Sequence, residues 1–159
     1  MDFERYGQAM TSTPSPRRII VGVDGSPNSA KAVDWAIEYA HAGDTVVLVS
    51  AWSPVVVPAD MALSYTFDDT GARSLLDGEV ARVKVAGEKR SVKIEGAFET
   101  TDPRTAILSA TSDLVVVGAR GHGGIAGLLL GSVADYVARH SKVPVVIVPS
   151  PKDKNKDKS

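Results

Sequence analysis

The sequence contains no cysteine, and this absence removes several kinds of chemistry. Disulfide bonds, thiolate metal sites and thiol catalysis are all excluded. A chain without cysteine fits a reducing compartment, and we expect the protein to be cytoplasmic. Residues 1–16 also lack the apolar stretch of a secretory signal, and no apolar run approaches the ~18 residues that a bilayer span requires. We therefore expect no membrane partner.

An excess of basic charge is missing too. The 18 Lys and Arg residues are balanced by 19 Asp and Glu residues, which leaves a net charge of −1. Proteins that bind nucleic acid draw most of their affinity from cationic side chains that neutralise phosphates. Nucleic acid is therefore not an expected partner.

Two familiar nucleotide motifs are also absent. The chain has no Gly-x4-Gly-Lys-Ser/Thr, so it lacks the lysine that P-loop enzymes place on the β- and γ-phosphates. Residues 121–126 match Gly-x-Gly-x-x-Ala, the dinucleotide fingerprint. About five further residues separate this match from the next predicted helix, and no strand-end acid follows ~20 residues on. NAD is therefore not an expected ligand.

What the chain does contain is one folded domain with a polar segment at each end. A length of 159 residues with 43% hydrophobic residues is typical of a single soluble domain. Residues 1–16 are rich in Ser, Thr and Pro, and residues 151–159 alternate Lys with Asp and Asn. We expect both segments to be disordered tails that flank a domain over residues 17–150.

Within this domain, β-branched runs alternate with helical patterns. The predicted strands are residues 18–24, 45–51, 91–98, 114–117 and 145–148, and the predicted helices are residues 27–40, 72–86, 103–110 and a segment that begins at 132. Such alternation implies right-handed crossovers and parallel strands. The predicted fold is therefore an α/β, doubly wound, five-stranded parallel sheet with helices on both faces.

The most informative motif follows the fourth predicted strand. It reads Gly-x2-Gly-x9-Gly-Ser, formed by Gly118, Gly121, Gly131 and Ser132, and it also includes Gly123 and Gly124. Glycines allow positive φ and close backbone approach, and a helix start offers free N–H groups and a positive dipole end. We therefore predict a phosphate cradle. The Ser132 hydroxyl is also expected to cap its own helix, a role compatible with phosphate binding at Val133 and the neighbouring amides.

Three features together resemble the universal stress protein family over residues 18–149. They are Gly-Val-Asp-Gly-Ser at 22–26, the glycine spacing above, and Pro-Val-Val-Ile-Val at 144–148. The resemblance implies the strand order 3-2-1-4-5 and the ATP-binding branch of the family, which carries this glycine spacing. Residues 88–113 depart from the family pattern by looking a few residues short, which affects the sheet edge and not the nucleotide site.

The resemblance also implies roles for residues after the first two strands. Gly22 and the main chain at Ala51 would flank an adenine. Asp24 would lie near the adenine and ribose, or near a Mg²⁺ ion held by phosphate or water; its alternative role is to form the turn over residues 24–27. Arg120 is a candidate phosphate or ribose contact, with a solvent-facing arginine as the alternative. His122 is a further candidate contact, with a polar loop residue as the alternative.

These expectations lead to an ATP-binding regulatory protein whose ligand stabilises one conformation or assembly. One alternative is a slow ATPase or autophosphorylating enzyme, although the sequence presents no secure catalytic set. Another is a binder of a different adenine nucleotide such as cyclic AMP. The fifth strand, residues 145–148, is expected at a sheet edge, where the family resemblance implies pairing into a homodimer.

Overall fold

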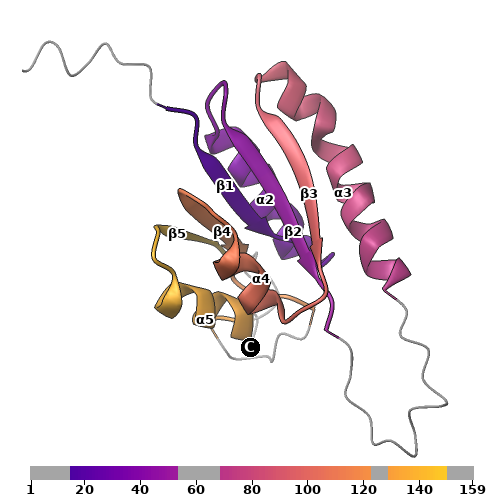
Figure 1. Ribbon diagram of the computed structural model, residues 1–159, viewed down its shortest axis with the longest axis vertical. Helices are drawn as coiled ribbons and strands as arrows, with labels where there is room; N and C mark the ends of the chain where they lie inside the picture. The colour runs from indigo at the N-terminus through magenta and orange to yellow at the C-terminus, as the bar shows by residue number, and fades with distance from the viewer. Residues whose placement is uncertain (1–14, 54–68, 123–128, 150–159) are drawn as a thin grey trace, which may run out of the picture.

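In the computed structural model, which describes residues 15–53, 69–122 and 129–149, five parallel strands form one sheet (Figure 1). The strand order is β3-β2-β1-β4-β5, which confirms both the predicted fold class and the predicted order. The strands are β1 (Arg18–Gly22), β2 (Thr45–Ala51), β3 (Lys93–Glu99), β4 (Leu114–Gly118) and β5 (Val145–Val148). The helices are α2 (Pro27–Tyr39), α3 (Thr70–Lys89), α4 (Pro103–Ser109) and α5 (Ser132–His140).

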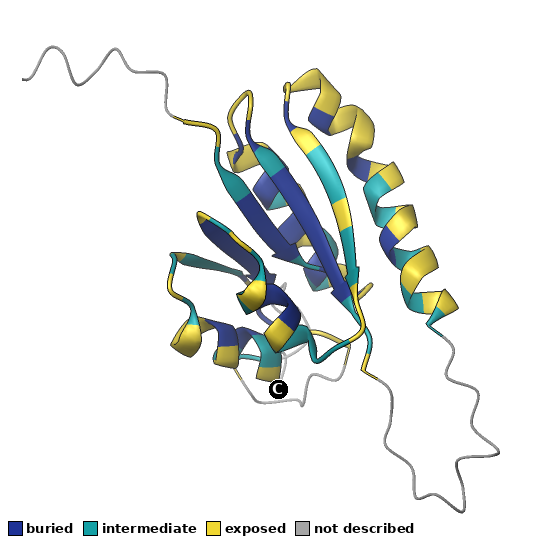
Figure 2. Ribbon diagram, in the orientation of Figure 1, coloured by how far each residue is buried: buried dark blue, intermediate teal, exposed yellow. Residues whose placement is uncertain are grey.

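Alternate residues of the central strands point to opposite faces of the sheet. In β1, Ile19 and Val21 belong to the core beneath α2 and α3, whereas Ile20 belongs to the core beneath α4 and α5. Figure 1 shows α4 and α5 in front of the sheet and α2 behind it. The central strands are buried on both faces, as Figure 2 shows for β1, which explains why their sequences are apolar nearly throughout.

Two helix starts follow their sequence signals. The Ser26 side chain accepts a 3.1 Å hydrogen bond from the Ser29 N–H, and Pro27 is the first residue of α2. At α4, Asp102 accepts a 2.8 Å bond from the Arg104 N–H. These caps fix the directions in which the chain leaves β1 and β3.

The start of α5 agrees with its prediction in position but not in its cap. Gly131 is the N-cap residue, Ser132 is the first helical residue, and no side chain of the residues that the structure describes caps this helix end. The predicted capping by the Ser132 hydroxyl was therefore wrong by one position. The hydroxyl cannot accept from the next turn once its own residue has helical φ and ψ. The N–H groups at this end of α5 are consequently left for another partner.

Other differences concern element ends and one helix face. The predicted first strand ran to Asp24, but β1 ends at Gly22, although the Val23 N–H still donates a 2.8 Å bond to the Val49 carbonyl. On α5, Tyr136 and His140 are both exposed and stack on each other with ring centroids 4.0 Å apart. Aromatic pairing four residues apart replaces burial there.

Several predictions fall outside what the structure describes. Residues 1–14 and 150–159, which make up most of the two predicted tails, lie outside the described residues. Within the described ranges, no helix combines the length and the apolar character needed to cross a membrane. The edge position predicted for the fifth strand is confirmed, because β5 ends the strand order.

Candidate functional site

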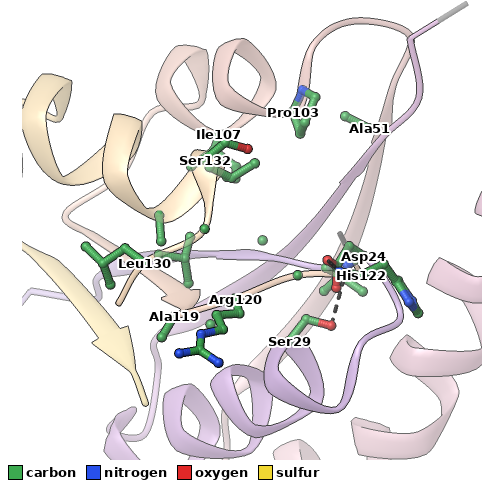
Figure 3. Close-up of a pocket in the computed structure, with 18 of the residues that line it drawn as sticks. Asp24, Ser29, Ala51, Pro103, Ile107, Ala119, Arg120, His122, Leu130 and Ser132 are labelled. Atoms are coloured by element: carbon green, nitrogen blue, oxygen red, sulfur yellow. Dashed lines mark hydrogen bonds between the residues drawn. The ribbon is translucent and has the colours of Figure 1, made fainter. Parts of the chain in front are cut away.

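A cavity of about 450 Å³ lies at the carboxyl ends of β1 and β4. These strands are neighbours, and their following helices α2 and α5 cover opposite faces of the sheet, so the chain diverges at this point. Such divergence opens the crevice in which doubly wound folds bind ligands. Figure 3 shows the side chains that surround the cavity.

Three hydrogen bonds hold the main chain that leaves β4. The Gly131 N–H donates a 2.7 Å bond to the Ala119 carbonyl, which folds the start of α5 back beside the end of β4. The Asn28 side-chain amide donates a 3.2 Å bond to the Arg120 carbonyl. The His122 N–H donates a 3.2 Å bond to Asp24 Oδ2. The loop is therefore attached to α5, to α2 and to the turn after β1.

One end of the cavity is the amino end of α5. Gly131, Ser132, Val133 and Ala134 all line it, and the helix has no side-chain cap. The unpaired N–H groups and the positive dipole end of a helix favour a bound anion. This end of the cavity therefore offers main-chain N–H donors to an anionic group.

Another part of the lining is apolar. It is formed by side chains from β2, α4 and β4: Val49, Ala51, Pro103, Ile107 and Val117. Figure 3 shows Pro103 and Ala51 at one side of the cavity. An apolar wall facing a few polar groups is typical of sites that take an aromatic ring on one side and a charged group on the other.

Asp24 contributes a carboxylate on the β1 side. Its Oδ1 accepts a 2.9 Å bond from the Ser26 N–H, which is the turn predicted as its alternative role. Burial raises the pKa of Asp24, but hydrogen bonds from Ser26, Ser29 and the His122 N–H together outweigh burial and leave the pKa below its ordinary value. The carboxylate is therefore ionised at neutral pH and accepts from main chain on both sides.

Close packing, and not unusual backbone geometry, requires Gly118 and Gly121. Among the described glycines only Gly25 and Gly43 have positive φ, so of the two uses expected for Gly118 and Gly121 the structure shows close backbone approach and not positive φ. A Cβ on Gly118 would lie 2.9 Å from the backbone of Asn28, and one on Gly121 would overlap Asp24 Oδ2. Glycine lets the loop approach α2 and Asp24.

Arg120 and His122 line the cavity but turn their side chains away from it. The Arg120 guanidinium points away from Ser132 in Figure 3, and its Nε is buried and has no hydrogen-bond partner among the residues that the structure describes. The His122 side chain is exposed and stands beside Gly25, where a Cβ would lie 3.4 Å from Nε2. Contact between Arg120 and a phosphate would require another rotamer, so its role stays a prediction.

All the predicted site residues that the structure describes line this one cavity: Gly22, Asp24, Ala51, Gly118, Arg120, Gly121, His122, Gly131, Ser132 and Val133. Gly123 and Gly124 lie outside the described residues. The sequence reasoning missed Ser29, Pro103 and Ile107, which also line the cavity, and Asn28, which supports it. Their local sequence is that of ordinary helix residues. Only the three-dimensional fold identifies them as residues of the cavity.

A metal site is not formed by protein side chains alone in the described ranges. Over residues 15–53, 69–122 and 129–149 there is no group of three or more His, Asp or Glu side chains that could hold an ion. A cation near Asp24 would therefore need ligands from a bound molecule or water.

Comparison with known proteins identifies the family. The universal stress protein family profile matches residues 16–149. A universal stress protein of Mycobacterium tuberculosis is 35% identical over 150 residues, covering 82% of this chain and 47% of the relative. A second from the same organism is 31% identical over 140 residues, covering 87% and 48%. The chain thus spans about half the length of the curated relatives it matches.

Comparison with solved structures also finds members of this family. A crystal structure of a universal stress protein in complex with cAMP is 31% identical, with a TM-score of 0.63 over 85% of this chain and 98% of that one. A universal stress protein family protein of Arabidopsis thaliana with AMP bound is 17% identical, with a TM-score of 0.60 over 87% and 94%, a likeness that shows the fold alone. The family match over most of the chain is decisive, and the chain belongs to the universal stress protein family.

Proposed function

We propose that this chain is a regulatory protein that binds an adenine nucleotide, ATP in particular, in the cavity between β1 and β4. One observation carries the proposal: the same cavity of about 450 Å³ is lined both by an apolar wall and by the start of α5, which has no side-chain cap among the described residues. A nucleotide has the same division, with a flat base at one end and phosphates at the other.

The base would lie near Gly22 and Ala51, against the wall that includes Ile107. The phosphates would accept from the main chain at Gly121 and from the first turn of α5. The glycine spacing typical of ATP-binding family members supports ATP as the ligand. The similar protein solved with cAMP, which is 31% identical to this chain, supports adenine nucleotides more generally.

Mg²⁺ would accompany ATP. Carboxylate and phosphate oxygens are the ligands that this ion prefers, and Asp24 is the carboxylate that lines the cavity in the described part of the chain. With a single carboxylate the ion would be bound mainly by phosphate oxygens and water. We therefore expect Mg²⁺ to bind together with ATP and not by itself.

Binding would act by population shift, because a ligand favours whichever conformation or assembly it binds better. A homodimer paired through β5 is the assembly we propose. This strand ends the sheet, and a second copy would satisfy its free edge. We place this role in the cytoplasm, where ATP is abundant.

The geometry favours binding over hydrolysis. Among the described residues that line the cavity, Asp24 and His122 are the side chains able to accept a proton. The lowered pKa of Asp24 makes its carboxylate a weak base, and the His122 side chain stands beside Gly25. Neither is arranged to activate a water molecule.

Calorimetric titration tests the proposal, with ATP, AMP and cAMP as ligands and GTP as the control base. We expect saturable binding of ATP, displacement by the other adenine nucleotides and weaker binding of GTP. Failure of every adenine nucleotide to bind at millimolar concentration would contradict the proposal. Turnover of labelled ATP that disappears in Asp24→Ala would instead establish the enzyme alternative.

A further inference from the structure

We propose that Asp24 is a positioning residue whose carboxylate holds the start of the loop after β4, at Gly121 and His122, in its binding conformation. This inference rests on the proposed function and gives one residue of that site a specific task. It starts from the two main-chain N–H groups that meet at the carboxylate, at Ser26 and His122.

Together the two contacts link the turn after β1 to the loop after β4. Asp24 and His122 are 98 residues apart in the sequence. Oδ1 accepts from Ser26 at 2.9 Å and so shapes the turn between β1 and α2. Oδ2 accepts from His122 at 3.2 Å and so ties the loop after β4 to that turn. Figure 3 shows Asp24 and His122 joined in this way. A carboxylate acceptor strengthens such bonds, since an ionised partner roughly doubles a neutral hydrogen bond.

Gly121 supplies a second, independent observation. A Cβ at this position would overlap Asp24 Oδ2, whereas its φ is not in the left-handed region. Glycine at 121 is therefore explained by the approach of the Asp24 carboxylate to the loop. The two residues are complementary in volume, because the Asp24 carboxylate occupies the space that a side chain at 121 would need.

The consequence concerns the amide donors of the cavity. The loop that Asp24 ties down includes Gly121, which lines the cavity beside Gly131, the N-cap residue of α5. If this segment were free to move, a phosphate would have to order it on binding, at a cost in affinity. Asp24 therefore acts on the ligand through His122 and Gly121, by ordering the loop in advance.

Asp24→Asn is the sharpest variant, because its remaining oxygen can still accept from Ser26 while the amide group cannot accept from His122. The matched control is Asp113→Asn. Asp113 accepts a 2.7 Å bond from the Arg18 N–H, the same kind of contact at the other end of the sheet. His122→Ala is a second control, because it retains the main-chain donor.

The first measurement uses ligand-free protein. A long-range NMR correlation between the His122 amide nitrogen and Asp24 Cγ should be observed in the wild type. The His122 amide should exchange at least about tenfold faster in Asp24→Asn, from the loss of one charge-assisted bond. It should keep its rate in Asp113→Asn. Absence of the correlation, or an unchanged exchange rate, would overturn the inference whether or not ATP binds.

The second measurement separates positioning from ribose contact. Affinities for ATP, 2′-deoxy-ATP and 3′-deoxy-ATP are compared in the wild type and in Asp24→Asn. If Asp24 orders the loop, the variant loses about tenfold for all three nucleotides; if it contacts a ribose hydroxyl, the loss disappears for the nucleotide that lacks that hydroxyl. Absence of ATP binding in the wild type would refute the proposed function alone, because the ligand-free NMR result stands apart from it.

Discussion

The N–H of Gly131 donates to the carbonyl of Ala119, at 2.7 Å, and this bond closes the loop that joins β4 to α5. Because Ala119 follows β4 directly and Gly131 caps α5, the bond sets the amino end of the helix against the carboxyl end of the strand. The position of the amino end of α5 beside the cavity depends on this hydrogen bond. Without it the N–H groups of the first helical turn would not face the apolar wall formed by α4 and β2.

Gly118→Ala should destabilise the protein even though it adds a single methyl group. The new Cβ would lie 2.9 Å from the Asn28 backbone, which cannot move without displacing α2. We expect a loss of about 2 kcal/mol in the free energy of unfolding, measured by urea denaturation. Gly78→Ala is the control, since nothing lies within 4 Å of its Cβ and it sits within α3, so it should stabilise by about 1 kcal/mol. Equal effects of the two changes would contradict this packing argument.

Ser132→Asp should affect stability and nucleotide binding in opposite directions. A negative charge in the first turn of α5 interacts favourably with the helix dipole, which should raise the melting temperature of ligand-free protein slightly. The same charge would repel a phosphate and lower ATP affinity by about tenfold or more. Ala138→Asp, on the exposed face of the same helix, should leave affinity unchanged. Unchanged ATP affinity in Ser132→Asp would show that phosphates do not bind at this helix end.

Gly121→Ala and Asp24→Ala should be strongly non-additive in stability. The added Cβ and the carboxylate compete for one volume, so removing the carboxylate relieves the clash. We expect Gly121→Ala to cost about 2 kcal/mol in the wild type and at least about 1 kcal/mol less in Asp24→Ala. A double-mutant cycle of unfolding free energies measures this coupling, and strict additivity would mean that the two groups do not meet.

Acid should lower the free energy of unfolding, partly through Asp44. This residue is buried at the end of the sheet opposite the cavity. Burial raises the pKa of Asp44, but the Arg17 guanidinium 2.6 Å away and the N–H groups of Arg17 and His41 outweigh burial and lower it below its ordinary 3.8. Since the folded pKa is the lower one, the carboxylate stabilises the fold above pH 3.8, and this contribution is lost as pH falls through the folded value.

The variant Asp44→Asn isolates this contribution. At pH 7 it should cost about 3 kcal/mol, because Arg17 loses its charged partner. The difference between wild type and variant should shrink as pH falls below about 4, close to the ordinary pKa of an aspartate. Urea denaturation of both proteins at pH 7 and pH 3 measures it. A difference that is the same at both pH values would show that Asp44 is not the titrating group.

The fold could be predicted because its signals are local. Apolar runs bounded by turn residues mark strands that are buried on both faces, and caps such as Ser26 and Asp102 mark helix starts. The start of α5 at Ser132 was predicted correctly, but its cap was assigned to Ser132 and not to Gly131, because a serine after a glycine satisfies the capping pattern as well as the glycine itself. Tertiary packing decides which of these two residues takes the cap position, and the local sequence does not specify that packing.

The sequence predicted the site residues at strand ends and in the glycine motif. It did not predict the residues that reach the site from the sides of helices. Ile107 and Asn28 reach the cavity region only because α4 and α2 lie against the sheet. The reason for Gly121 also depends on tertiary structure, since its neighbour Asp24 is far away in sequence. Spacing indicated that glycine was needed for close backbone approach, but it could not identify Asp24 as the group approached.

Amide chemical-shift mapping on addition of ATP tests the central claim most directly. The account predicts that the largest shifts fall on Gly121, Ser132 and Val133, with smaller ones on Val49 and Ile107 along the apolar wall. A titration in which these amides stay unchanged, or in which the shifts gather on another face of the sheet, would contradict the proposed nucleotide site.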